Sequence, residues 1–228
     1  MAVVERHILC TATLPDTLVA HAAAQGLRIR VLPFIRTEPA ISLATRDAIT
    51  HHGSAHTHVV FTSVHAVEAV RTLLPIRRVP NWTAHVVGER TRSAVRTLMP
   101  TMATGCTEAY ADNLAQALIA DGTIRRILFC CGDQRLDTLP DTLRQADIAV
   151  EEVVVYHTFA TPHHLTDTPD AVLFLSPSAV ESFFQLNILH PDTVPFAIGR
   201  TTGRALQQHT DQRILQPPTP SRTALIDA

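Results

Sequence analysis

One apolar stretch occurs twice in this chain, and its repetition constrains the fold more than any other feature. Residues 59–63 form an apolar run that ends on Thr62 and Ser63, and residues 172–178 repeat the pattern and end on Ser176 and Ser178. Apolar residues at helical spacing follow each run. Each copy therefore predicts a buried strand that stops on hydroxyl side chains where a helix begins. Such a junction offers hydroxyls and free backbone N–H groups to an anion.

Matched spacing extends the repetition over the whole chain of 228 residues. The sequence Thr-Leu-Pro-Asp-Thr-Leu occurs at both 13–18 and 138–143. We predict two copies of one alternating strand–helix unit, each with about five parallel strands, and the alternative is chance similarity among such units. The sequence leaves open whether the copies fold in tandem or exchange their first segments. The equivalent pairs are Phe61 and Phe174, 113 residues apart, and Gly88 with Gly199 and Leu114 with Leu225, each 111 apart.

The remaining pattern predicts alternating elements with loops at 77–82 and 105–110. The second loop precedes the helix expected at 112–120. Strands are expected at 7–10, 27–34, 59–63, 85–88, 126–131, 148–156, 172–175 and 196–199, and helices at 13–24, 43–52, 91–98, 112–120, 136–145 and 202–208, with a short last helix.

Composition excludes several function classes. The net charge of −2 does not favour a broad nucleic-acid-binding surface. All 19 basic residues are arginine, so Schiff-base chemistry on a lysine, including pyridoxal phosphate anchoring, is excluded. The four cysteines are expected to be reduced thiols, and no signal segment or membrane-spanning run is recognised, which predicts a cytoplasmic protein without membrane contact.

Histidine is abundant but its pattern does not predict a metal site. The candidates lie in polar stretches without a cysteine partner or a helical H-E-x-x-H arrangement, so we interpret them as solvated loop residues. The sequence after Gly88 lacks the further glycines of a dinucleotide-binding loop. The histidine candidates are His51, His52, His56, His58, His163 and His164.

An ordered set of short motifs resembles the uroporphyrinogen-III synthase family. The set covers nearly the whole chain, and each motif is weak by itself. Two positions depart from the family pattern: Thr11 to Thr13 stand where the family often has an arginine, and His65 replaces the usual asparagine or other residue. The motifs are Phe61-Thr62-Ser63 with 66–69, Val87-Gly88 with Thr91, 111–114, Cys131-Gly132 leading to Leu139, 155–158, 176–178, 198–202 with 205–206, and 218–220.

The resemblance implies a particular domain organisation. In this family two α/β domains are joined by a two-stranded ladder, and the N-terminal segment belongs with the C-terminal half. We therefore expect one domain at 1–34 plus 159–228 and another at 38–154. The paired connectors at 33–37 and 155–160 would act as a hinge between two lobes that hold an acidic ligand.

The resemblance also implies the reaction and the partners. The family cyclises hydroxymethylbilane, a linear tetrapyrrole rich in carboxylates, to uroporphyrinogen III, with inversion of the last ring and loss of water. No cofactor and no metal are expected, because the pyrroles supply the electrons. We expect a monomer with a small-molecule substrate and a transient contact with the preceding enzyme of the pathway.

Tyr156, at the expected connector, is the predicted catalytic residue, since a neutral phenol can donate a proton to the departing hydroxyl. The alternative for Tyr156 is a structural ring with a hydrogen-bonded oxygen, and for the junction hydroxyls it is a plain helix cap. Arg135 and Arg200 could add charge-assisted contacts or be solvated surface residues. The predicted substrate-binding residues are Thr62, Ser63, Gly88, Thr91, Arg135, Ser176, Ser178, Gly199, Thr201 and Thr202.

Two other functions compete with this enzyme. A two-lobed protein that binds a small molecule without catalysis would share the duplicated lobes and the hinge. A nucleotide-dependent enzyme is disfavoured by the absence of a phosphate-binding loop.

Overall fold

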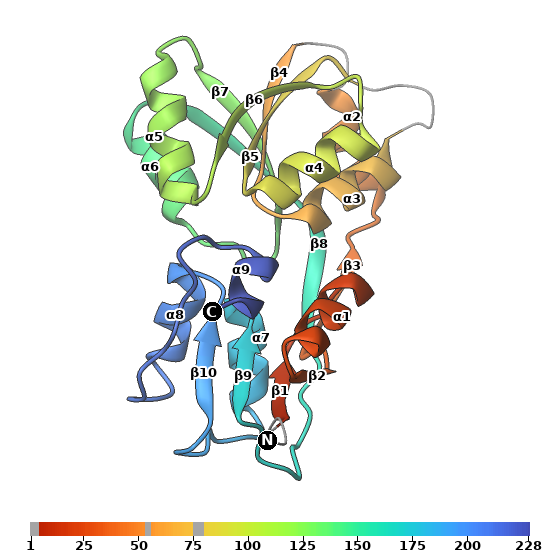
Figure 1. Cartoon of the computed structure of the whole chain (residues 1–228). Coiled ribbons are helices and arrows are strands. Elements are labelled where there is room, and N and C mark those ends of the chain that lie inside the picture. The colour runs from red at the N-terminus through yellow and green to blue at the C-terminus, as the bar shows by residue number, and fades with distance from the viewer. Residues whose placement is uncertain (1–4, 53–55, 75–79) are drawn as a thin grey trace. The chain divides into compact units, whose positions relative to one another are not determined.

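The structure is a computed structural model, and it describes residues 5–52, 56–74 and 80–228. The chain divides into two compact units, each made of a sheet flanked by helices (Figure 1). Unit 1 is Met1–Arg36 with Phe159–Ala228, and unit 2 is Thr37–Thr158.

Unit 1 combines the two ends of the chain in one parallel sheet. Its strands are β1 (Arg6–Cys10), β2 (Leu27–Val31), β9 (Ala171–Phe174) and β10 (Val194–Ala197), and its helices are α1 (Asp16–Ala24), α7 (Pro177–Phe184), α8 (Arg200–Leu206) and α9 (Arg222–Ile226). In the part that the structure describes, the strand order is β10-β9-β1-β2, and every neighbouring pair is parallel. The pairing of β1 with β9 places the first strand in the sheet of the C-terminal half.

Unit 2 holds the larger sheet. Its helices are α2 (Leu43–His51), α3 (Val64–Leu73), α4 (Glu89–Leu98), α5 (Ala111–Asp121) and α6 (Thr138–Gln145), and its strands are β4 (Thr57–Phe61), β5 (Trp82–Val87), β6 (Ala103–Glu108) and β7 (Arg126–Gly132), together with β3 (Ile35–Pro39) and β8 (Ala149–Ala160). Among the described residues the order is β3-β8-β7-β4-β5-β6. The chain passes from one unit to the other within β3 and again within β8.

The predicted duplication is visible in the strand order and in the register. The order β10-β9-β1-β2 of unit 1 corresponds to β5-β4-β7-β8 of unit 2. Leu9 pairs with Val172 as Leu128 pairs with Val59, so the equivalent strands meet at equivalent residues. The described sheets have four and six strands rather than five each, and a parallel bridge from Phe196 to Leu215 extends the smaller one.

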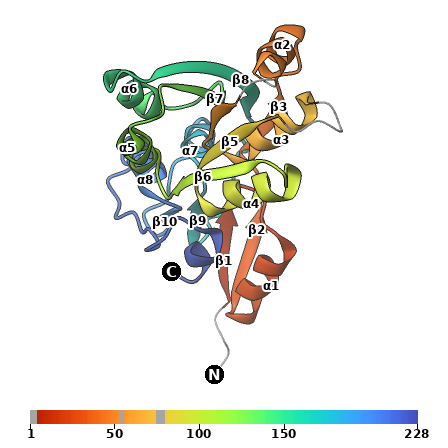
Figure 2. The same ribbon diagram turned by 90° about the horizontal axis from the view of Figure 1, so that it is seen from above.

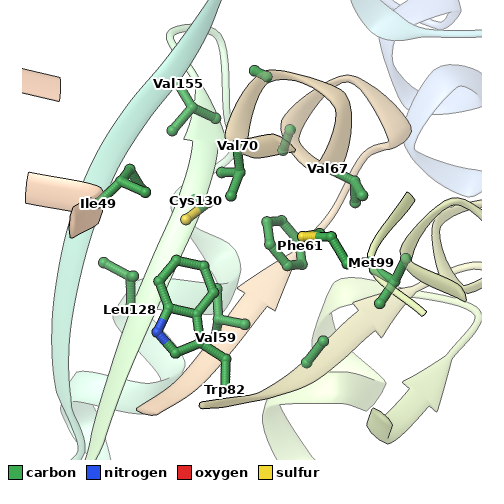
Figure 3. Close-up of a cluster of buried hydrophobic side chains, with 14 of the residues drawn as sticks. Ile49, Val59, Phe61, Val67, Val70, Trp82, Met99, Leu128, Cys130 and Val155 are labelled. Atoms are coloured by element: carbon green, nitrogen blue, oxygen red, sulfur yellow. The ribbon is translucent and has the colours of Figure 1, made fainter. Parts of the chain in front are cut away.

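Helices cover both faces of each sheet, and the central strands are accordingly apolar along most of their length. All four residues of β9 are buried, as are the last three of β4. In unit 2, α3 and α4 pack on one face and α5 and α6 on the other (Figure 2). Phe61, Trp82 and Met99 are buried in the hydrophobic core on the first of these faces (Figure 3).

The expected loop at 105–110 is wrong, because Ala103–Glu108 is strand β6 at the edge of the sheet. The segment is polar because its first three residues are exposed. Gly105 is required there by close packing, since a Cβ atom at this position would lie 2.5 Å from Cε1 of His85. The glycine makes room for a neighbouring ring and does not form a turn.

In residues 5–52, 56–74 and 80–228, no helix has the length and apolar character needed to cross a bilayer.

Candidate active site

The end of β4 carries the hydroxyl at the centre of the candidate site. Ser63 is the N-cap of α3, and its Oγ accepts a hydrogen bond from the N–H of Ala66 at 3.2 Å. The same hydroxyl donates to the phenol oxygen of Tyr156 at 3.1 Å. Ser63 is thus a helix cap, as the plainer alternative holds, and it also binds the predicted catalytic residue.

Tyr156 lies on β8, which is two strands away from β4 in the sheet of unit 2. Its side chain packs against the hydrophobic core that α3 covers. Burial raises the pKa of this phenol, because a phenolate would lose its hydration. The hydrogen bond from Ser63 opposes the effect without cancelling it. Tyr156 is therefore protonated at neutral pH, and its own proton is available, since Ser63 is the donor in their hydrogen bond.

The end of β7 fixes the position of Tyr156. Gly132 is paired with Tyr156 at an irregularity in the register between β7 and β8. A Cβ atom on Gly132 would lie 2.5 Å from Cζ and 2.7 Å from the oxygen of Tyr156, so only glycine leaves space for the ring. The backbone N–H of Asp133 donates to the carbonyl of Tyr156, and its carboxylate accepts from the N–H of Thr158 at 2.9 Å.

The other predicted residues of unit 2 differ in exposure. Thr62 is half-buried beside Ser63. Gly88 follows β5 as the N-cap of α4 with φ at 83°, a conformation that favours glycine. Thr91, in the first turn of α4, is only 4% exposed, so its hydroxyl is shielded from solvent.

Arg135 is bound to carboxylates of its own unit. Its guanidinium contacts Glu152 and lies 2.6 Å from Asp137. Glu152 also accepts from Arg144. The hydrogen bond to Glu152 raises the pKa of Arg135, and these ion pairs compete with any external carboxylate.

Unit 1 repeats the same junction without a tyrosine. Ser176 caps α7 by accepting from the N–H of Ala179 at 3.2 Å, which matches the distance found at Ser63. Ser178 is half-buried in the first turn of α7. Gly199 is the N-cap of α8 in an extended conformation. Thr201 on this helix is exposed, whereas Thr202 is 3% exposed.

The loop after β1, where the family often has an arginine, is held by Thr11. Its side chain is fully buried, and its hydroxyl donates to the carbonyl of Leu173 at 2.9 Å. Thr11 therefore stabilises the sheet of unit 1 by binding the backbone of β9.

Three of the six histidine candidates, His52, His58 and His163, are not solvated loop residues, which corrects the interpretation from the sequence for these positions. His56 and His164 are exposed outside helices and strands, as expected, and His51 is exposed at the end of α2. His52 is 9% exposed and lies 2.9 Å from a carboxylate oxygen of Glu151. His58 is part of β4, and its Nδ1 lies 3.0 Å from Nε2 of the buried His85. His163 packs edge-on against Phe34 in unit 1. The sequence did not indicate these contacts, because the sequence neighbours of the three histidines are mostly polar and their partners are distant in the chain. No group of three or more His, Cys, Asp or Glu side chains in the described segments could hold a metal ion.

Hollows in the surface of unit 1 lie at the amino ends of its strands. One encloses about 280 Å³ beside Val172, Phe183 and Thr193. Another is lined by His7, Arg28 and neighbouring residues. Neither of these two contains a predicted site residue.

Comparison with known proteins decides the family. The family model described as uroporphyrinogen-III synthase HemD matches residues 16–227. The chain belongs to the uroporphyrinogen-III synthase family. It is accordingly a cyclising lyase of tetrapyrrole biosynthesis that acts on a small molecule, which decides against the non-catalytic alternative.

Solved structures share the fold. A mutant uroporphyrinogen III synthase from Thermus thermophilus aligns with a TM-score of 0.66 and 14% identity over 97% of this chain and 95% of that chain. The uroporphyrinogen-III synthetase from Helicobacter pylori aligns with a TM-score of 0.64 and 15% identity over 97% of both chains. These likenesses confirm the predicted α/β fold with helix-flanked parallel sheets.

Three residues of the site were missed at the sequence level. Gly132 was recognised only as part of a motif, and Asp133 gave no signal at all. His65 was noted as a departure from the family, but its neighbours Tyr156 and Glu68 were not foreseen as its partners. The contacts of Gly132, Asp133 and His65 with β8 depend on the strand register, which is not encoded locally.

Proposed function

We propose that this chain cyclises hydroxymethylbilane to uroporphyrinogen III, with inversion of the last ring and loss of water, and that Tyr156 donates the proton to the departing hydroxyl. The observation that supports Tyr156 is its hydrogen bond with Ser63. Because Ser63 accepts from an amide and donates to the phenol oxygen, the phenol proton is directed toward another acceptor. Polarisation along such a chain of hydrogen bonds strengthens the terminal donor.

Burial of Tyr156 suits this role. The raised pKa keeps the phenol protonated until a strong acceptor forms beside it. A hydroxyl that leaves carbon with its bonding electrons is such an acceptor. General acid catalysis of this kind contributes about 10²- to 10⁴-fold, and we expect a loss at or below the lower end of this range when the phenol is removed, because a water molecule can protonate the departing hydroxyl in its place.

We propose that the strand-end junctions bind the carboxylates of the substrate. Free N–H groups at the starts of α3, α4 and α7 carry the positive end of each helix dipole. Thr62, Ser178 and Thr201 add hydroxyls that solvent reaches. Thr91 and Thr202 would need a local movement to do so, and Arg135 and Arg200 would act by charge.

Selecting one mode of closure requires little energy. The substrate can also close unaided to the isomer without ring inversion, so the enzyme must favour the other pathway. A hundredfold preference corresponds to about 2.7 kcal/mol of differential stabilisation. Two or three hydrogen bonds that form only in the favoured geometry supply this amount.

Product analysis tests the proposed function. Freshly prepared hydroxymethylbilane is incubated with and without the protein, and the products are oxidised and separated as type I and type III isomers. We expect the type III isomer to dominate only with the protein. Type I product alone, at the spontaneous rate, would refute the proposal.

Substitution of Tyr156 tests the proton donor. We expect Tyr156→Phe to slow formation of the type III isomer by roughly tenfold to hundredfold without abolishing it, because binding and geometry remain. A loss smaller than twofold would remove Tyr156 from this role.

We propose that the protein works as a cytoplasmic monomer, where a reducing medium preserves the buried thiols of Cys10, Cys130 and Cys131. A transient contact with the enzyme that makes hydroxymethylbilane, the hinge at 33–37 and 155–160, and the absence of a cofactor stay predictions.

A further inference from the structure

His65 lies next to the proposed proton donor. It is the second residue of α3, two positions after Ser63, and its side chain is 52% exposed. Its ring centroid is 5.8 Å from that of Tyr156, with an angle of 58° between the rings. Two titratable side chains in unit 2, one on α3 and one on β8, therefore lie next to each other.

One ring nitrogen of His65 is fixed by its surroundings. Nδ1 lies 3.3 Å from Oε2 of Glu68, one turn along α3, and 3.4 Å from Oγ1 of Thr37 on β3. An ionised carboxylate can only accept, so the neutral imidazole carries its hydrogen on Nδ1. Nε2 then has a free lone pair. This is the arrangement by which a carboxylate orients a histidine base.

We propose that His65 is a second catalytic residue, the base that removes the carbon-bound proton released when the macrocycle closes. The inference rests on the proposed function. Cyclisation needs one proton for the departing hydroxyl, whose C–O bonding electrons leave with oxygen as water. It also releases one proton from the pyrrole carbon that forms the last carbon–carbon bond, and the C–H electrons restore the aromatic ring.

The two residues balance these transfers. Tyr156 gives a proton and becomes a phenolate, and Nε2 of His65 takes one and becomes an imidazolium. Return of that proton from His65 to Tyr156 restores both residues, and the net change is loss of water. Among the described residues, the titratable groups in contact with His65 are Glu68 on α3 and Tyr156 on β8, while β3 contributes the neutral Thr37.

A different role for His65 would be to bind a substrate carboxylate as a cation. The two roles predict different kinetics. A base must be neutral, so activity falls as the pH drops through the range in which histidine is protonated. A residue that binds the substrate as a cation binds it more tightly when protonated, and substitution of that residue raises KM more than it lowers kcat.

The test compares His65→Asn with wild type from pH 5 to 8, using hydroxymethylbilane with hydrogen or deuterium on the free α-carbon of the terminal pyrrole. We expect kcat for the type III isomer to fall roughly tenfold to hundredfold, the acid limb of the profile to flatten, and KM to change by less than about threefold. An isotope effect larger than that of wild type should appear, because removal of the carbon-bound proton then limits the rate.

His51→Asn, on an exposed residue at the end of α2, serves as the control and should behave as wild type.

The outcomes separate the two proposals. If wild type forms no excess of the type III isomer, the proposed function fails. If wild type is active but His65→Asn keeps its rate and its acid limb, or loses only in KM, the role of His65 as a base is refuted. Glu68→Gln should lower kcat less than His65→Asn, since it only disorients the imidazole.

Discussion

Gly132→Ala tests whether the end of β7 positions Tyr156. The backbone of Gly132 is not in the left-handed region, so alanine is compatible with it. The new Cβ would lie 2.5 Å from Cζ of Tyr156, whereas ordinary contacts begin at 3.4 Å, so the ring must move by 3.4 − 2.5 = 0.9 Å. The ring is the end of a side chain that can rotate, and the free energy of unfolding should therefore fall by only about 1 kcal/mol.

The catalytic cost should be larger than the cost in stability. A shift of 0.9 Å breaks the 3.1 Å hydrogen bond from Ser63 if the ring moves away from it. Losing one hydrogen bond costs about 1 kcal/mol, or roughly fivefold, and a misplacement of about 1 Å can cost about 10²-fold. We expect kcat for the type III isomer to fall between fivefold and a hundredfold, measured per folded protein by product analysis beside thermal unfolding.

A matched control is available in the same unit. A Cβ on Gly105 would lie 2.5 Å from the ring of His85, an equally close contact that does not involve Tyr156. Gly105→Ala should destabilise unit 2 but leave kcat of the folded protein within twofold of wild type. If Gly132→Ala also stays within twofold, or if both variants lose kcat equally, the positioning role of Gly132 is wrong.

Two further predictions follow from hydroxyl and histidine contacts in unit 2. Ser63→Ala removes the cap of α3 and the hydrogen-bond donor to Tyr156, so it should lower the free energy of unfolding by about 1 kcal/mol and also lower kcat. Ser42→Ala, at the cap of α2, should lower the free energy of unfolding alone. Equal effects of the two substitutions on kcat would contradict this. Burial and the neighbouring His58 lower the pKa of His85 from 6.5 to about 4. The contribution of neutral His85 to the free energy of unfolding is therefore complete above pH 6.5 and is lost as the pH falls toward 4. A difference of 2.5 pKa units at 1.36 kcal/mol per unit makes this loss about 3 kcal/mol. In urea unfolding, the free energy of unfolding of His85→Gln should therefore depend less on pH than that of wild type. Parallel pH dependences for the two proteins would contradict this.

Local features of the sequence predicted most of the fold. The apolar runs at β4 and β9, each followed by a serine, predicted buried strands and capped helices, because burial and capping depend on neighbouring residues. The edge strand β6 escaped prediction, since an exposed strand has a polar sequence and its glycine makes room for His85. The duplicated spacing predicted the common architecture of the units, but the pairing of β1 with β9 required the family resemblance.

The site was less predictable for a related reason. Ser63 and Tyr156 are 93 residues apart in the sequence. They meet because β4 and β8 both pair with β7, so only one strand separates them in the sheet. The irregular register at Gly132, which aligns it with Tyr156, has no local sequence pattern. Arg135 was considered for binding by its charge alone, and the carboxylates of Glu152 and Asp137 that occupy it could not be inferred from spacing.

The most direct test of Tyr156 as the proton donor varies the leaving group. Single-turnover rates of wild type and Tyr156→Phe are compared for hydroxymethylbilane and for an analogue whose hydroxyl is replaced by a carboxylate ester, which leaves without a proton. The account predicts a loss of roughly tenfold to hundredfold with the hydroxyl substrate and less than about threefold with the ester. Equal losses with both substrates would contradict it.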